Sequence, residues 1–211
     1  SVFLIVDVVA PLEIQETSGK LEFSDNFLFF WFLGMGLWTA STALFGACLT
    51  YMISQHYVGQ EIKVFAAVRF AWQRFSKVLG AYLLTFFALM ALFITIIGIP
   101  IGIYLMFRWI FIIQVGSLER LGPRAILKRS SALLRQHFWR VLGIELLLVG
   151  ILFLIELPFW AIPVVGWHLG FVLTSPIFWV SITLIYFDLR VRKEAYNLEK
   201  LSEELGIKLA I

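Results

Sequence analysis

The stretch Gln73-Arg-Phe-Ser-Lys-Val-Leu-Gly80 recurs 63 residues later as Gln136-His-Phe-Trp-Arg-Val-Leu-Gly143. The same offset places Ile99-Pro100 over Ile162-Pro163. In each copy a basic amphipathic segment leads into an apolar run, which an Ile-Pro pair then interrupts. The pattern predicts an internal repeat in which each copy is an elbow helix followed by a membrane hairpin.

The composition of the chain is that of an integral membrane protein. Hydrophobic residues make up 61% of the 211 residues and charged residues 15%, and the mean hydropathy is +0.91. Long uncharged runs of this kind are typical of helices that cross a bilayer. Because most of the chain is committed to lipid, no room is left for a separate soluble catalytic domain.

We expect an all-α polytopic transmembrane bundle that forms one membrane domain over residues 1–211. Six spans are predicted, at residues 1–10, 27–53, 78–97, 101–117, 141–160 and 167–187. Two amphipathic elbow helices are predicted at 60–77 and 123–139, and a tail at 188–211. Residues 1–10 are too few to cross a bilayer, so we expect them to be the outer end of a first span that begins before Ser1.

The second predicted span carries small residues at helical spacing. These are Gly36, Ala40, Ala43 and Ala47. Small side chains let helix backbones approach closely in lipid. We therefore expect this face to be a packing surface.

The distribution of charge predicts the orientation. Residues 55–77 carry a net charge of +3 and residues 118–140 a net charge of +5, whereas residues 11–26 carry −3. Loops rich in Lys and Arg stay on the cytoplasmic side. Both elbows and both ends of the chain are therefore expected in the cytoplasm. The two copies then enter the membrane from the same side, as parallel repeats.

Four ionisable residues fall inside or near the predicted spans: Asp7, Arg108, Glu145 and Glu156. An arginine at the centre of a span costs roughly 2.5 to 3.5 kcal/mol on insertion scales, so Arg108 should face protein, a partner or water. Glu145 and Glu156 are its candidate partners, and the sequence leaves open which one it meets. One interpretation of these residues is a polar site for an ion or a lipid headgroup between the last two hairpins. The other is a structural ion pair or a snorkelling side chain.

Basic side chains on the elbows predict contact with anionic lipid headgroups. The set consists of Lys63, Arg74, Lys77, Arg124, Lys128, Arg129, Arg135 and Arg140. An equally open interpretation is that these charges only anchor the topology. Because they lie on helices that enter the membrane, we expect phospholipid as the partner and no nucleic acid.

Sequence motifs of catalysis are absent. The chain contains no His-Glu-x-x-His, no phosphate-binding glycine loop ending in Lys-Ser/Thr and no Gly-x-Ser-x-Gly. Its three histidines, His56, His137 and His168, are far apart in the sequence. We therefore expect no enzymatic activity, no metal site and no cofactor.

Two segments carry a resemblance to a known family. They are Leu118-Glu-Arg-Leu-Gly-Pro-Arg-Ala-Ile-Leu-Lys-Arg-Ser-Ser-Ala-Leu-Leu-Arg135 and the exit segment Tyr186-Phe-Asp-Leu-Arg-Val-Arg-Lys-Glu194. Both resemble the membrane domain attached to some bacterial glycerophosphodiester phosphodiesterases and the related YciC-like membrane proteins. The resemblance covers residues 55–199, with Ala195 and Asn197 in place of glycine and aspartate. It implies a multi-pass bundle of the bacterial inner membrane without catalysis of its own, because the phosphodiesterase chemistry belongs to a separate metal-dependent barrel.

The exit segment also has a pattern of its own. If the last span continues as a helix, Asp188 meets Arg192 and Arg190 meets Glu194 at four-residue spacing. Beyond it, an apolar stripe is formed by Leu198, Leu201 and Leu205. This stripe predicts that the tail docks on the elbows of the same chain or on a partner protein.

Three functions fit these patterns. The first is a noncatalytic membrane protein that binds lipid or acts as a scaffold. The second is an accessory subunit of a larger membrane complex, with other membrane proteins as partners. The third is a transporter of a small solute or lipid, with its polar site at Arg108, Glu145 and Glu156.

Overall fold

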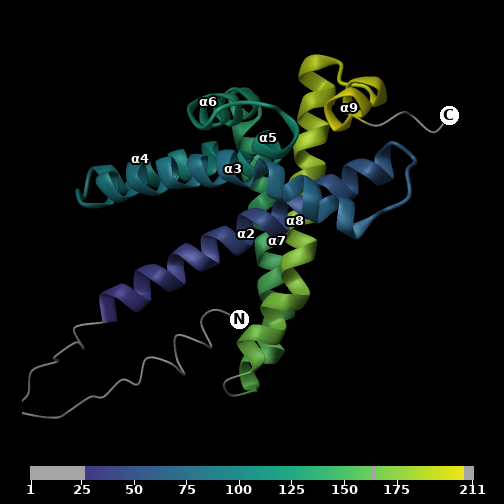
Figure 1. Cartoon of the computed structure of the whole chain (residues 1–211). Coiled ribbons are helices and arrows are strands. Elements are labelled where there is room, and N and C mark those ends of the chain that lie inside the picture. The colour runs from purple at the N-terminus through teal and green to yellow at the C-terminus, as the bar shows by residue number, and fades with distance from the viewer. Residues whose placement is uncertain (1–26, 163–164, 207–211) are drawn as a thin grey trace, which may run out of the picture. The chain divides into compact units, whose positions relative to one another are not determined.

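The computed structural model describes residues 27–162 and 165–206 (Figure 1). Its contacts divide the chain into two units, Ser1–Thr42 and Ala43–Ile211. In the described ranges the elements are α2 (Phe27–Tyr57), α3 (Val64–Phe93), α4 (Gly98–Arg108), α5 (Ile112–Leu118), α6 (Pro123–Leu134), α7 (Phe138–Glu156), the 3-10 helix η1 (Leu157–Ala161), α8 (Gly166–Glu194) and α9 (Leu198–Leu205). The predicted first span at residues 1–10, which includes Asp7, lies outside the described residues.

Five helical segments in the described ranges are long and apolar enough to cross a membrane. They are Phe29–Tyr57, Val64–Phe93, Gly98–Leu118, Phe138–Ala161 and His168–Glu194. Each contains most of one of the five later spans expected from the sequence. The all-α membrane class is thereby confirmed, and the chain is an integral membrane protein.

Equivalent positions in the two copies of the repeat are buried. Ala71 and Val78 of α3 are buried, and so are Leu134 and Val141, which lie 63 positions later. Matched burial means that the two copies turn the same face toward the protein. The repeat therefore extends from the sequence to the packing.

The two copies differ in how the elbow joins its span. In the first copy, α3 runs without a break from Val64 to Phe93, so the elbow expected at 60–77 and the span after it form one helix. Its buried face there consists of alanines such as Ala67 and Ala71, which allow a helix to pass its neighbours closely. In the second copy the bulkier Leu133 and Leu134 are buried, α6 ends at Leu134, and α7 begins at Phe138.

The first hairpin turns earlier than the sequence analysis places it. A break was expected at Gly98-Ile-Pro100, but the non-helical residues are 94–97, and Gly98 to Pro100 form the first turn of α4. The backbone N–H groups of a first helical turn have no partner within the helix, so a proline there removes no hydrogen bond. Pro100 therefore starts the return helix.

A second break divides the span expected at 101–117 into α4 and α5. The hydroxyl of Ser130 on α6 accepts a hydrogen bond from the Phe111 N–H at 3.2 Å and donates one to the Arg108 carbonyl at 3.0 Å. Ser130 is fully buried. Irregular backbone is tolerated in a membrane protein where the protein itself satisfies the freed polar groups. One side chain of the second elbow thus completes the first hairpin.

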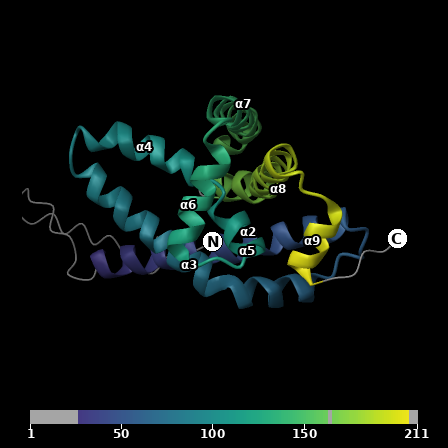
Figure 2. The ribbon, with the colours of Figure 1, turned by 90° about the horizontal axis from the view of Figure 1, so that it is seen from above.

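Helix α5 lies in the core of the second unit, since all seven of its residues are buried. It packs on α3 and α6, and its Leu118 belongs to the same apolar cluster as Ile126 of α6 and Tyr186 of α8. Both views show α7 and α8 side by side as a hairpin (Figure 1, Figure 2). The two hairpins are thus connected through α5 and α6.

We predict that Gly116→Val destabilises the protein, because α3 packs closely on α5 at this glycine. A Cβ atom at Gly116 would lie 2.8 Å from Cγ2 of Val78 and 3.3 Å from Cδ1 of Ile126. Overpacking of this kind costs about 1 to 3 kcal/mol. The check is the apparent melting temperature of the purified protein in detergent. The control is Gly150→Val on α7, where a Cβ has no neighbour within 4 Å, and an equal effect of the two variants would contradict the prediction.

Candidate functional site

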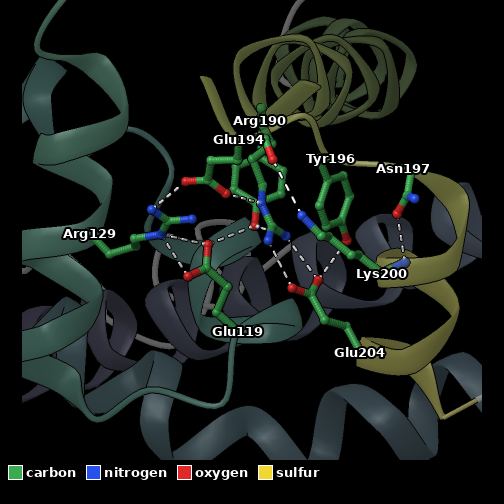
Figure 3. A network of polar contacts seen from close by, with 9 residues as sticks. Glu119, Arg129, Arg190, Glu194, Tyr196, Asn197, Lys200 and Glu204 are labelled. Carbon is green, nitrogen blue, oxygen red and sulfur yellow. Dashed lines mark hydrogen bonds and ion pairs between the residues drawn. The ribbon is translucent and has the colours of Figure 1, made fainter. Parts of the chain in front are cut away.

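A network of charged side chains connects the end of α8 to α9, with Arg190 at its centre (Figure 3). Only 7% of the Arg190 side chain is exposed. Its Nη2 and Nη1 atoms lie 2.8 and 2.9 Å from the two carboxylate oxygens of Glu204, a bidentate pair. Its Nε donates to Glu194 at 3.2 Å, and its guanidinium lies 3.7 Å from the ring centroid of Tyr196. Arg190 therefore attaches α9 to the last membrane helix.

Arg129 of α6 is the second cation of the network. Its Nε lies 2.7 Å from Glu119, and its Nη1 lies 2.5 Å from Glu194. The Tyr186 hydroxyl accepts a hydrogen bond from Arg190 and donates one to Glu119, each at 3.1 Å. The two arginines are therefore joined both through Glu194 and through Tyr186. Four segments meet here: the α5–α6 loop, α6, α8 and α9.

The surroundings of Arg129 and Tyr196 raise the pKa of both side chains, so that Arg129 stays charged and Tyr196 stays protonated. Burial alone would lower the pKa of Arg129. Its hydrogen bonds to Glu194 and Glu119 have the opposite, larger effect, so the pKa of Arg129 lies above its ordinary value. Burial raises the pKa of Tyr196, and its hydrogen bond to Glu204, 2.6 Å long, raises it again. Arg129 is therefore a fixed cation and Tyr196 a fixed hydroxyl donor.

Several expectations for the exit segment are confirmed. The four-residue pairs form, with Arg190 to Glu194 at 3.2 Å and Arg192 to Asp188 at 2.8 Å. The tail docks on its own chain, since Leu201 is buried in the apolar cluster that contains α5 and α6 residues. The roles of Glu119 and Glu204 were not foreseen. The only signal in the sequence was that Glu119 and Arg190 lie in the two segments that carry the family resemblance.

The basic residues of α6 and its C-cap residue Arg135 divide into two groups. Arg124, Lys128 and Arg135 are exposed, whereas Arg129 is half-buried between two carboxylates. At 100° per residue, the three exposed residues lie within about 40° of one another around the helix. Among the described residues they take part in no ion pair. They form an uncompensated cationic surface, which we call the α6 stripe, and Arg129 is a structural residue instead.

The remaining members of the predicted headgroup set are dispersed. Lys63 is exposed just before α3, Lys77 is half-buried within it, and Arg74 lies over the ring of Phe70 at 5.5 Å. Arg140 on α7 is exposed and lies 3.5 Å from Asp188. The structure therefore does not gather the eight predicted residues into one patch.

The first turns of α3 present apolar side chains to the outside. Val64, Phe65, Val68 and Trp72 are exposed, and Phe65 keeps 93% of its surface. Ala67 in the same turns is buried. An amphipathic segment of this kind lies in a membrane interface with its apolar face in the acyl region. Its Lys63 lies at the end where the helix begins.

No hydrogen bond or ion pair joins Arg108, Glu145 and Glu156, the three residues of the predicted polar site. Arg108 ends α4 beside the break, and its guanidinium hydrogen bonds, both 3.5 Å, go to the Tyr104 hydroxyl and the Ser131 carbonyl. Glu156 instead accepts a hydrogen bond from Thr174 of α8. Glu145 is buried on α7, and neither of its carboxylate oxygens has a partner. The main contacts of α4 are with α3 and α6, whereas α7 packs mainly on α8.

In the described part of the chain, no set of side chains is arranged to bind a metal ion. Within it, no three His, Cys, Asp or Glu side chains converge as a metal ion would require. The carboxylates that do converge, such as Glu194 and Glu204, already bind Arg190. The chemistry of the network itself is therefore charge pairing between side chains of the same chain.

We predict that Arg190→Gln releases α9 from the last membrane helix. Removing one partner of a buried ion pair costs about 3 kcal/mol or more, because Glu194 and Glu204 are left without their common cation. Limited proteolysis at residues 195–205 should become faster, and the melting temperature in detergent should fall. Arg192→Gln is the matched control, since its pair with Asp188 is half-exposed and such pairs contribute about 0 to 1 kcal/mol. Equal protease resistance of the two variants would refute a locking role for Arg190.

Comparison with known proteins gives no assignment beyond this geometry. No protein family, no curated protein and no solved structure matches the chain. The resemblance to the membrane domain of glycerophosphodiester phosphodiesterases therefore stays a prediction. What the protein can bind follows from its exposed side chains.

Proposed function

We propose that this chain is a noncatalytic integral membrane protein that binds anionic phospholipid headgroups through the α6 stripe. The observation that carries the proposal is the division among the α6 cations. Arg129 is neutralised by two carboxylates, whereas Arg124 and Lys128 on another side of the helix and Arg135 at its C-cap have none. Uncompensated cations beside apolar spans favour a partner that supplies phosphate.

The expected strength of this interaction is substantial. A basic side chain near an anionic membrane surface contributes about 1 kcal/mol, so three together contribute about 3 kcal/mol. Such an attraction is screened by salt, because the Debye length falls to about 3 Å at 1 M ionic strength. Retention of lipid by the α6 stripe should therefore weaken as salt is raised.

The exposed apolar face of α3 supports a location in the membrane interface. Phe65 and Trp72 of α3 are exposed, and the exposed Lys63 immediately precedes the helix. Both the stripe and this face belong to the loops whose excess of Lys and Arg predicts the cytoplasmic side. We therefore place the headgroup surface in the cytoplasmic leaflet, in line with a bacterial inner membrane protein.

The other candidate functions have less support. A transporter was expected to use Arg108, Glu145 and Glu156 together, and these residues do not meet. An accessory subunit would use the same exposed apolar face of α3 to contact a partner protein. Such a partner would have to leave the α6 stripe uncovered or match it with acidic residues, which makes the stripe the feature to test first.

The test is to neutralise the stripe in the triple variant Arg124→Gln, Lys128→Gln, Arg135→Gln. Native mass spectrometry of the protein in mild detergent then measures binding of added phosphatidylglycerol. Loss of about 3 kcal/mol corresponds to an affinity that is roughly 100-fold lower. The melting temperature should stay close to that of the unmodified protein, because these side chains make no ion pairs.

The matched control keeps the charge and changes the side chains, in the variant Arg124→Lys, Lys128→Arg, Arg135→Lys. We expect it to bind phosphatidylglycerol within a few-fold of the original affinity, since the attraction depends mainly on charge. Unchanged binding by the Gln triple variant would refute the proposal. Copurification of a stoichiometric protein partner that is lost from the Gln variant would favour the accessory subunit instead.

A further inference from the structure

Two grooves flank Leu184 on α8. The first, about 550 Å³ in volume, lies between the end of α2 and α8, and its wall includes Met52, Ile53 and Tyr57 as well as Leu184. The second, about 230 Å³, lies between α7 and α8 and is lined by Ile144 together with Leu184. The larger volume is in the range of ligand-binding clefts. The half-exposed Leu184 thus lies between two grooves whose walls are mainly, but not entirely, apolar.

One face of α8 changes from apolar to charged after Leu184. Val180, Leu184, Asp188 and Arg192 follow one another at four-residue spacing, so they lie along one side of the helix. The first two line the α2–α8 groove, and Asp188 lines the α7–α8 groove. An elongated molecule lying along this face would have an apolar part beside Leu184 and a polar part beside Asp188.

The charges at the polar end do not balance. Asp188 lies 2.8 Å from Arg192 and 3.5 Å from Arg140, which itself lines the α7–α8 groove. Two cations share one carboxylate, which leaves a charge of +1. Both guanidinium groups are about half-exposed, so each keeps N–H donors available for an outside acceptor.

We propose that this surface is a site for one diacyl phospholipid, with an acyl chain in each groove and Leu184 between them. Its phosphodiester group lies against Arg140 and Arg192 and supplies the single negative charge that Asp188 leaves unmatched. Arginine suits phosphate because its planar fork donates two parallel hydrogen bonds. The proposal shares its ligand class with the proposed function and rests on it in that respect, but the site lies on α2, α7 and α8 and not on the α6 stripe.

The headgroup should carry no cation of its own. A phosphatidylethanolamine ammonium would be placed beside two arginines, whereas the glycerol of phosphatidylglycerol adds no charge. We therefore expect the site to favour phosphatidylglycerol over phosphatidylethanolamine with the same acyl chains. A preference for one headgroup distinguishes a specific lipid site from nonspecific binding of lipid to apolar surfaces.

The experiment counts tightly held lipid by native mass spectrometry of the full chain in mild detergent, with each of these two lipids added in turn. Leu184→Trp puts a bulkier side chain between the two grooves, so it should obstruct the acyl chains and abolish the 1:1 phosphatidylglycerol adduct. Leu173→Trp is the matched control, because Leu173 is exposed on the same helix and lines neither groove. Arg140→Gln and Arg192→Gln should each weaken the adduct about tenfold, the effect of one charge-assisted hydrogen bond.

The sharpest variant is Asp188→Asn, which removes a charge but leaves the shape of the α7–α8 groove nearly unchanged, because Asn is close to Asp in size. It removes the carboxylate that competes with phosphate for both arginines, so we expect tighter binding of phosphatidylglycerol by several-fold. A purely structural role for Asp188 predicts weaker binding or none. Retention of the adduct by Leu184→Trp, or a weaker adduct in Asp188→Asn, would overturn the proposal.

The outcomes for this site and for the α6 stripe can be told apart. If the Gln triple variant of the stripe keeps its one tight lipid but loses the salt-sensitive additional ones, both proposals hold. If it binds all lipids unchanged while Leu184→Trp loses the tight one, the groove site holds and the stripe fails. If Leu184→Trp changes nothing while the triple variant loses lipid, the groove site fails and the proposed function stands.

Discussion

The pairing of Arg190 and Arg129 with three carboxylates is the constraint on which the rest of the second unit depends. It holds the end of α8 against the α5–α6 loop, α6 and α9, and it does so with hydrogen bonds of 2.5 to 3.2 Å. A charge buried this deeply is costly unless it is paired and fully hydrogen-bonded. The network is therefore stable only as a whole, and each of its segments is fixed by the presence of the others.

This network also explains why the basic surface is where it is. The α6 helix has an inner side, fixed by Arg129 and by buried Leu133 and Ile126, and this orientation leaves Arg124 and Lys128 outside. The ion pairs thus determine which cations are available to lipid. In the proposed function, structure and lipid binding are carried by different residues of this segment, and for this reason substitutions can separate them.

The sequence was sufficient for what depends on periodicity and composition. The five apolar helices, the repeat, and the pairs of Asp188 with Arg192 and Arg190 with Glu194 follow from spacing within one helix. It was insufficient for contacts between distant segments. Nothing local to Glu119 or Glu204 shows that an arginine will meet them, and Arg108 looked like a partner of Glu145 only because both fall inside apolar runs. Helix breaks were also misplaced, since the turn at 94–97 carries no proline and the α4–α5 break is stabilised from another helix.

The capping of that break by Ser130 imposes an order on folding. The N–H of Phe111 and the carbonyl of Arg108 are made about twenty residues before the hydroxyl that satisfies them. During synthesis the first hairpin therefore has exposed backbone groups at its end, and in lipid such groups favour continuing the helix straight through. Only when the second elbow has been made and packed can the chain bend there. The α4–α5 break in the first copy of the repeat thus depends on Ser130 in the second copy. In a chain truncated before residue 130, we expect one long helix in place of α4 and α5.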